Sequence, residues 1–350
     1  MHLDFEIEGK NFLFLIIPAI ISFLLVPLIK KLAYKLIILD KPNSRKLHRK
    51  PIPNIGGIAI FISFLITVFY LKYFTEINFE NFNIIFLASL GVISIGLLDD
   101  LYNLSPLVRL MAQFFITIFI WNNGISISNL NFEYLNFGIN SIKIPNIFSL
   151  LLTFFWVSGI VNAINWIDGL NGLASGVVIL ILIGIAKIAF FKNLIGLFLF
   201  SLILIGGSIG FLFHNLRPNN IIMGDNGSNF LGFQLSLLSL YAGSNNKDVF
   251  QSSDLTIFPI IPILLLGFPL LDMVRVILKR IKNKSTPFLP DRNHFHHILI
   301  DNNLSHKEVL FLIFSITFYL ISISFLFTGI NNKIIIFASM NFILFIEFMI

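Results

Sequence analysis

The stretch IFSLLLTFFWVSGIVNAINWIDGLNGLASGVVILILIGIAKIAFF, residues 147–191, consists of two apolar segments joined by a short polar turn. Each apolar segment, 147–167 and 173–191, is long enough to cross the roughly 30 Å hydrocarbon core of a bilayer as an α-helix. Between them, Gly169 and Gly172 interrupt the helix and allow the backbone to approach a ligand closely. The stretch therefore predicts two membrane-spanning helices with a polar turn at the membrane surface.

The composition extends this prediction to the whole chain. Of 350 residues, 56% are hydrophobic and 12% are charged, whereas a soluble domain carries roughly 25% charged residues. A soluble fold cannot cover this much apolar surface, because its own surface must face water. Cysteine is absent, which excludes disulfide bonds and thiolate metal sites. The net charge of +6 is not arranged as a basic patch with interleaved aromatic residues, so nucleic acid is not an expected partner.

Apolar segments of bilayer length predict an all-α integral membrane protein, a single polytopic domain over residues 1–350 with about eleven transmembrane helices. We do not expect the first helix to be a signal peptide, because Lys30 and Lys31 follow it and no small-residue cleavage site is present. The expected helices lie near residues 12–29, 55–73, 83–98, 107–121, 147–167, 173–191, 194–213, 228–243, 254–278, 308–328 and 333–350.

The distribution of positive charge predicts the orientation of these helices. Most of the 24 Lys and Arg residues fall in alternate loops, and the positive-inside rule places those loops in the cytoplasm. The N-terminus is therefore expected outside and the C-terminus in the cytoplasm. Every unusual polar cluster then lies in the cytoplasmic loops, at residues 30–54, 99–106, 165–172, 214–227 and 279–307. Because five clusters converge on one face, we expect them to form one site.

Three of these clusters contain acidic residues at helix ends. Asp99 and Asp100 end the third expected helix, where adjacent carboxylates repel each other unless a cation or a proton intervenes. A solvated helix end is the alternative interpretation of this pair. Asn165 and Asp168 are three residues apart, so they share a helix face, and their oxygens are ligands that Mg²⁺ accepts.

Asp225 lies between two glycines before the eighth expected helix. A carboxylate at this place suits a metal ion held beside bound phosphates. The alternative is that Asp225 or Ser228 is the N-cap of that helix.

The two remaining clusters are basic. Residues 291–297 contain three of the seven histidines, but without Cys and without a His-Glu-x-x-His motif they do not predict zinc. Histidines beside Arg292 suit an anionic diphosphate, with contact to lipid headgroups as the alternative. In the first inside loop, Lys46 or His48 is expected to contact a phosphate, unless these charges only fix the topology.

Together, the five segments resemble the polyprenyl-phosphate N-acetylhexosamine-1-phosphate transferase superfamily, glycosyltransferase family 4, over residues 39–300. The Arg45–His48 and Asp291–His297 segments are more similar to its undecaprenyl-phosphate N-acetylglucosamine 1-phosphate transferases than to its pentapeptide translocases. One departure is Ile222, which stands where members often carry an aromatic residue that stacks on uracil.

The resemblance implies roles for individual residues. It makes Asp99 and Asp100 the catalytic acidic pair and makes Asn165 and Asp225 the metal ligands. The expected substrate-binding residues are Asp168, Asn171, Lys46, His48, Asn215, Arg292, His294, His296 and His297.

The implied reaction transfers N-acetylhexosamine-1-phosphate, with N-acetylglucosamine as the expected sugar, from a UDP-sugar to undecaprenyl or another polyprenyl phosphate. UMP is released, and the lipid-linked product serves cell-envelope glycan synthesis. Mg²⁺ is the expected cofactor, with Mn²⁺ as an alternative, and direct attack by the acceptor phosphate is favoured over a covalent aspartyl intermediate. The resemblance also implies a multi-pass protein of the bacterial inner membrane with its active site on the cytoplasmic face, and it is compatible with a homodimer.

Other functional classes fit the sequence less well. A multi-pass secondary transporter keeps ionisable residues near the midplane on broken, repeated helices, whereas these acids gather at one face. An intramembrane aspartyl protease would carry Gly-x-Gly-Asp, and Ile222 replaces the first glycine. The spaced Asp-Gly-x-x-Ala-Arg signature of phospholipid-type alcohol phosphotransferases is absent.

Overall fold

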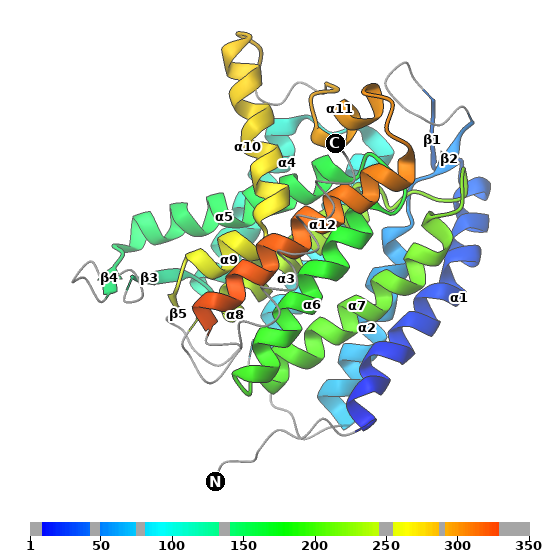
Figure 1. Cartoon of the computed structure of the whole chain (residues 1–350). Coiled ribbons are helices and arrows are strands. Elements are labelled where there is room, and N and C mark those ends of the chain that lie inside the picture. The colour runs from blue at the N-terminus through cyan, green and yellow to red at the C-terminus, as the bar shows by residue number, and fades with distance from the viewer. Residues whose placement is uncertain are drawn as a thin grey trace.

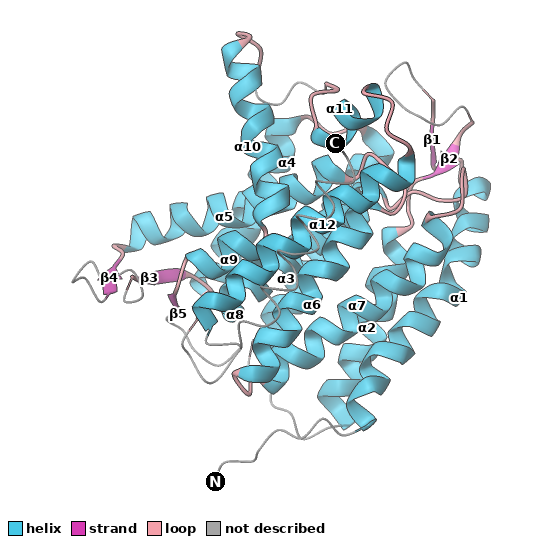
Figure 2. Cartoon of the chain, in the orientation of Figure 1, coloured by secondary structure: helices cyan, strands magenta, loops and turns pink. Residues whose placement is uncertain are grey.

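The computed structural model describes residues 9–42, 50–74, 81–132, 141–244, 255–286 and 291–328, and these fold mainly into a helical bundle (Figures 1 and 2). Two 3₁₀ turns, Gly9–Phe12 and Phe325–Thr328, lie at the two ends of the described chain. The α-helices are α1 (Leu13–Lys35), α2 (Gly57–Phe74), α3 (Phe82–Tyr102), α4 (Pro106–Asn122), α5 (Asn146–Ile167), α6 (Leu173–Phe191), α7 (Ile195–Asn215), α8 (Gly224–Gly243), α9 (Ile260–Leu265), α10 (Gly267–Lys282), α11 (Phe295–Asp301) and α12 (His306–Ser324).

Six helices of the described chain, α1, α3, α5, α6, α7 and α12, are long and apolar enough to cross a membrane. The apolar helices α2 and α4 are slightly shorter. The prediction of a helical membrane protein with several spans is therefore confirmed. The count of eleven and the orientation of the termini stay predictions, and the span expected over 333–350 lies outside the described residues.

The centre of the bundle is α8, which is buried along nearly its whole length and packs against α3 and α5. Edge-to-face contacts join Phe230 of α8 to Phe61 and Phe64 of α2, with ring centroids 5.2 and 5.3 Å apart. Beside this core, α7 packs closely against α1, because a Cβ atom on Gly206 would lie only 2.1 Å from the carbonyl oxygen of Leu15. Such small residues allow membrane helices to approach backbone to backbone.

The structure corrects the span expected over 254–278. This segment instead forms a strand, the short α9 and then α10, with a break between the two helices at Leu266. Pro262 and Gly267 are the physical reason, since neither favours an uninterrupted helix. Figure 1 shows α10 projecting beyond the bundle at the end that also holds α11.

The helix boundaries at the acidic residues also differ from expectation. Helix α3 continues through Tyr102 and ends where Asn103 adopts a left-handed conformation, so Asp99 and Asp100 lie within its last turn. Helix α8 begins at Gly224, so Asp225 lies in its first turn.

Five short strands in the described residues were not expected from an all-α prediction. β1 (Leu39–Asp40) pairs with β2 (Ile52–Pro53) in antiparallel register. β3 (Ile127–Asn131) lies between antiparallel β4 (Ser141–Lys143) and parallel β5 (Leu255–Ile257). Figure 2 shows the two sheets in separate places, with β1 and β2 at the same end as α11. This hairpin brings Asp40 to the end of the bundle that carries the acidic helix ends.

Candidate active site

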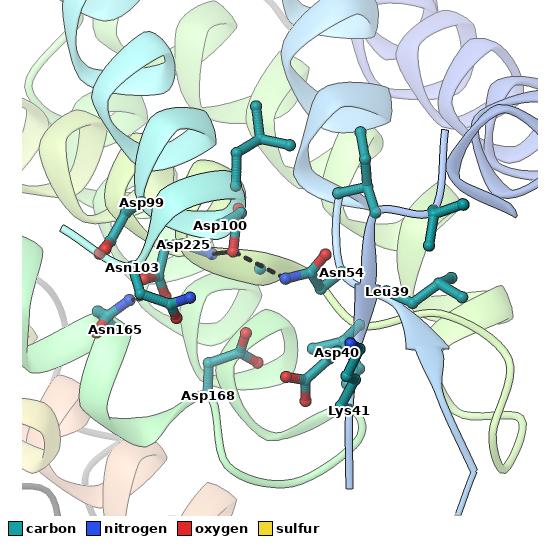
Figure 3. A pocket seen from close by; sticks show the side chains of 15 residues that line it. Leu39, Asp40, Lys41, Asn54, Asp99, Asp100, Asn103, Asn165, Asp168 and Asp225 are labelled. Carbon is teal, nitrogen blue, oxygen red and sulfur yellow. Dashed lines mark hydrogen bonds between the residues drawn. The ribbon is translucent and has the colours of Figure 1, made fainter. Parts of the chain in front are cut away.

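A cavity of about 620 Å³ lies at this end of the bundle (Figure 3). Of the five polar clusters that were expected to form one site, four contribute to its wall. The lining residues are Ile37, Ile38, Leu39, Asp40, Lys41, Asn54, Asp99, Asp100, Leu101, Asn103, Asn165, Asp168, Ile222, Gly224 and Asp225.

The carboxylates of Asp99 and Asp100 have different partners. Asp99 is 5% exposed, and its Oδ2 accepts a hydrogen bond from Nη1 of Arg109 at 2.8 Å. Its Oδ1 accepts from the backbone N–H of Leu104 at 2.8 Å. The same Arg109 nitrogen lies 3.9 Å from Oδ2 of Asp225. Arg109 therefore relieves the repulsion between Asp99 and Asp225.

Asp100 instead points to the beginning of α8. Its two oxygens accept from the backbone N–H groups of Asp225 and Asn226, both at 3.0 Å. They also accept from Nδ2 of Asn226 at 2.6 Å and from Nδ2 of Asn54 at 3.2 Å. Figure 3 shows the contacts to Asn54 and to Asp225.

The N-cap alternative for Asp225 and Ser228 is wrong. Met223 occupies the N-cap position, and no side chain of α8 itself caps the helix. The acidic residue that binds the first N–H groups comes from α3, so Asp225 itself remains directed at the cavity.

Asn165 and Asp225 meet at the cavity wall. Nδ2 of Asn165 donates to Oδ1 of Asp225 at 2.7 Å and to Oγ of Ser228 at 3.0 Å. The Asp225 side chain is 33% exposed, and both residues line the cavity. The predicted ligand pair is thus brought into contact at the cavity.

The chemistry of this pair fits Mg²⁺. Octahedral Mg²⁺ holds oxygens at about 2.1 Å, which places neighbouring ligands about 3.0 Å apart. Rotating the Asn165 amide by half a turn would present its oxygen to Asp225 at nearly this spacing. Within the described residues, no three His, Cys, Asp or Glu side chains form a group that could hold a metal. The Asn165–Asp225 pair suits Mg²⁺, which takes one or two protein ligands and completes its shell with water and phosphate oxygens.

Asp168 follows the last residue of α5 and faces the same cavity. Burial raises the pKa of its carboxyl to about 7, and the negative charge of Asp100 adds to the effect. A carboxyl with this pKa exchanges its proton near neutral pH, which suits a general acid or base.

The histidine segment packs against the α5–α6 turn but does not line the cavity. His296 is 2% exposed, and a Cβ atom on Gly169 would lie 2.2 Å from its Nε2. The ring of Trp166 lies edge-on to His294, with centroids 5.6 Å apart. Arg280 lies over the Trp166 ring, 4.8 Å from its centroid, and pairs with Asp291 at 2.8 Å. The fifth cluster is therefore joined to the turn that carries Asp168.

Asp272 of α10 orders this segment. Its carboxylate, 4% exposed, accepts from Nδ1 of His294, from the backbone N–H of Phe295 and from Arg275, at 2.8, 2.8 and 2.9 Å. The bond to Nδ1 fixes the tautomer and the orientation of the His294 ring.

Burial lowers the pKa of His296 to about 3, and the neighbouring His297 contributes. The pKa of His297 is also lowered, by burial and by the charge of Arg292. The lowered pKa values favour the neutral form of both rings, which offers one N–H donor and one acceptor nitrogen rather than positive charge. Arg292 itself pairs with Asp301 at 2.6 Å.

Two further predicted residues make backbone contacts. Asn215 is 3% exposed, accepts from the N–H of Gly172 at 2.6 Å and donates to the carbonyl of Ile221 at 2.9 Å. The carbonyl of Asn171 interacts with Nε2 of His306 at 2.9 Å. Asn215 thus ties the α5–α6 turn to the segment before α8, while substrate binding by either residue stays a prediction. Lys46 and His48 lie outside the described residues.

Sequence reasoning missed several residues of the site. Asp40 and Lys41 line the cavity, Arg109 joins two carboxylates, and Asp272 orders His294. Asp272 carried a usable signal, because an isolated carboxylate in an apolar segment normally has a specific partner.

The chain is similar to known proteins of one enzyme family. The profile of glycosyl transferase family 4 matches residues 82–243. A Bacillus subtilis protein, named as a probable undecaprenyl-phosphate N-acetylglucosaminyl 1-phosphate transferase, is 36% identical over 87% of this chain and 81% of its own length.

Two further relatives come from other bacteria. A Thermotoga maritima undecaprenyl-phosphate alpha-N-acetylglucosaminyl 1-phosphate transferase is 33% identical over 87% of this chain and 88% of its own. A Mycobacterium leprae decaprenyl-phosphate N-acetylglucosaminephosphotransferase is 30% identical over 85% of this chain and 78% of its own length. With this identity over most of both chains, the protein belongs to glycosyl transferase family 4.

Proposed function

We propose that this protein transfers N-acetylglucosamine-1-phosphate from UDP-N-acetylglucosamine to undecaprenyl phosphate, with release of UMP. The names of the relatives support the sugar phosphate and the polyprenyl phosphate acceptor. The observation that carries the proposal is the cavity lined by Asn165, Asp168 and Asp225 at one end of a bundle of membrane-length helices. This position gives access to a lipid phosphate and to an aqueous sugar nucleotide at once.

The reaction is a displacement at phosphorus. An oxygen of the acceptor phosphate forms a bond to the β-phosphorus, the one bonded to the sugar. The bond from this phosphorus to the oxygen bridging the two phosphates breaks, and its electron pair leaves with UMP. Because the acceptor phosphate is already a nucleophile, we propose direct attack, for which in-line positioning and charge neutralisation are the main requirements.

The residues of the cavity divide these tasks. Asp168, with its pKa near 7, suits removal of the last proton from the acceptor phosphate, whose second pKa is about 6. Asp99 and Asp100 suit this role less well, because Arg109 holds the first and the N-terminus of α8 holds the second. Arg109 adds positive charge beside Asp225, where negative charge would otherwise accumulate.

Asn165 and Asp225 are the residues that would hold Mg²⁺. When bound, the ion supplies polarisation of the diphosphate oxygens and neutralisation of their charge. Positive charge in the predicted inner loops supports a cavity on the cytoplasmic side of the bacterial inner membrane, where sugar nucleotides are made.

The test is transfer of radiolabel in detergent from UDP-N-acetyl[¹⁴C]glucosamine to undecaprenyl phosphate. We expect label in the lipid phase with UMP release, loss of both on addition of EDTA, and loss of both in Asp225→Asn and Asn165→Ala. The matched control is Asn123→Ala, an exposed asparagine at the C-cap of α4 that does not line the cavity. Turnover only with another UDP-hexosamine would show that the donor carries a different sugar. A folded protein that is inactive with every UDP-sugar would refute the proposed transferase activity.

A further inference from the structure

The first turn of α8 lies at a meeting point of three backbones. A Cβ atom on Gly57 of α2 would lie 2.0 Å from Cα of Gly227, and one on Gly96 of α3 would lie 2.5 Å from the carbonyl oxygen of Asp225. Helix α8 begins at Gly224, which has a φ of +78°, and a Cβ atom there would collide with the carbonyl oxygen of Asn54. No larger residue fits these places without displacing backbone, so the start of α8 is held between α2 and α3.

The N–H groups at the start of an α-helix have no partner within the helix and need a capping acceptor. The α8 N-cap residue, Met223, supplies none. The acceptor comes from α3, since Asp100 binds the N–H groups of Asp225 and Asn226. A carboxylate also complements the positive end of the helix dipole.

We propose that Asp100 is a positioning residue that caps α8 from another helix and acts on the reaction only through Asp225. This inference rests on the proposed function, in which Asp225 faces the diphosphate. Asp100 receives four N–H donors, which matches the number of lone pairs of a carboxylate. A base or a metal ligand needs a lone pair that is directed at its substrate or ion.

The contrast with Asp225 supports this assignment. The Asp225 side chain is 33% exposed, and its partners at the cavity are side chains, Asn165, Arg109 and Asp99. Asp100 binds the backbone of the residue that carries this side chain. Loss of the cap would therefore displace Asp225, and a misplacement on the order of 1 Å is enough to reduce turnover on the order of 100-fold.

The experiment compares purified Asp100→Asn, Asp225→Asn, the double variant and wild type in detergent. Transfer rates are measured well below the lowest Tm and across pH 6–9. We expect Asp100→Asn to lower Tm by a few degrees and to lower kcat on the order of 100-fold, with the shape of the pH profile unchanged. Added to Asp225→Asn, the same substitution should cost less than about 3-fold more, because both act through one side chain.

Asn226→Ala is a second variant that keeps the Asp100 carboxylate and removes its shortest contact. We expect its Tm and kcat to fall in the same direction as those of Asp100→Asn. If Asp100 were itself the reactive group, Asn226→Ala would instead shift the pH profile of transfer, because it removes a hydrogen-bond donor from the reactive carboxylate.

A third readout does not depend on turnover. Mg²⁺ should raise the Tm of wild type, raise that of Asp100→Asn less, and leave that of Asp225→Asn unchanged. Failure of label transfer in wild type would therefore refute the proposed function and still leave this readout to decide on the cap. The proposal is overturned if Asp100→Asn removes a limb of the pH profile, if it lowers kcat at unchanged Tm, or if it lowers Tm at unchanged kcat.

Discussion

Replacement of Arg109 by glutamine should destabilise the protein, because it leaves the buried carboxylate of Asp99 without its cation. Removing one partner of a fully buried ion pair costs about 3–5 kcal/mol. The Arg109 side chain is 27% exposed, and Asp99 keeps the N–H of Leu104, so we expect about 2 kcal/mol. At about 2–4 °C per kcal/mol, Tm should fall by about 4–8 °C.

The assay is thermal unfolding in detergent without substrate, at neutral pH. Arg217→Gln is the matched control, since Arg217 is exposed and outside the cavity, and its effect should stay within about 0.5 kcal/mol. Arg109→Lys should lie between Arg109→Gln and wild type, because lysine keeps the charge without the planar donor geometry.

A double-mutant cycle isolates the contact itself. In the presence of Asp99→Asn, the further change Arg109→Gln should cost clearly less than it does in wild type, because the carboxylate that needs the cation is gone. Equal Tm values for Arg109→Gln and Arg217→Gln, or full additivity with Asp99→Asn, would refute the reasoning.

Three further predictions concern the α5–α6 turn and its neighbours. Asp168→Asn should raise Tm in EDTA by an amount that grows from pH 5 to about pH 7 and then levels off. The reason is that the pKa of Asp168 is raised in the folded state, so ionisation destabilises the fold once the pH exceeds the ordinary pKa of about 3.9. A pH-independent difference would contradict this. Gly169→Ala should displace His296, cost about 1–3 kcal/mol of stability and slow transfer. The control Gly159→Ala, whose Cβ would meet only Met273 at 3.8 Å, should have none of these effects. Equal behaviour of the two alanine variants would count against the packing of Gly169 on His296. Asp272→Asn should lower the transfer rate roughly 10-fold by weakening the bond to His294, and an unchanged rate would show that this ring needs no fixed orientation.

Much of this architecture follows from local properties of the sequence. The helices around residues 147–191 are predictable because their length and apolar composition match a bilayer. Convergence of four of the polar clusters follows from their positions at helix ends, since helix ends on one side of a membrane lie in one plane. The break between α9 and α10 was also visible, in Pro262 and Gly267, but hydropathy alone merged the two helices into one span.

The partners of the charged residues were not predictable. Asp100 and Asp225 are 125 positions apart, and only the close packing of α3, α2 and α8 brings one carboxylate onto the helix start that carries the other. The sequence around Asp99 and Asp100 does not indicate that the two carboxylates have separate partners. The partners of Arg109 were not predictable for a similar reason. The direction of its side chain depends on the turn between α3 and α4, where Asn103 is left-handed and Ser105 caps α4.

The measurement that tests the proposed reaction most directly uses UDP-N-acetylglucosamine labelled with ³²P at the β-phosphate, with undecaprenyl phosphate as acceptor. Transfer of the phospho-sugar predicts that ³²P enters the lipid product, that the released UMP carries none, and that no ³²P remains on the protein. Appearance of labelled UDP would mean that the sugar moves without its phosphate, and that result would contradict displacement at the β-phosphorus.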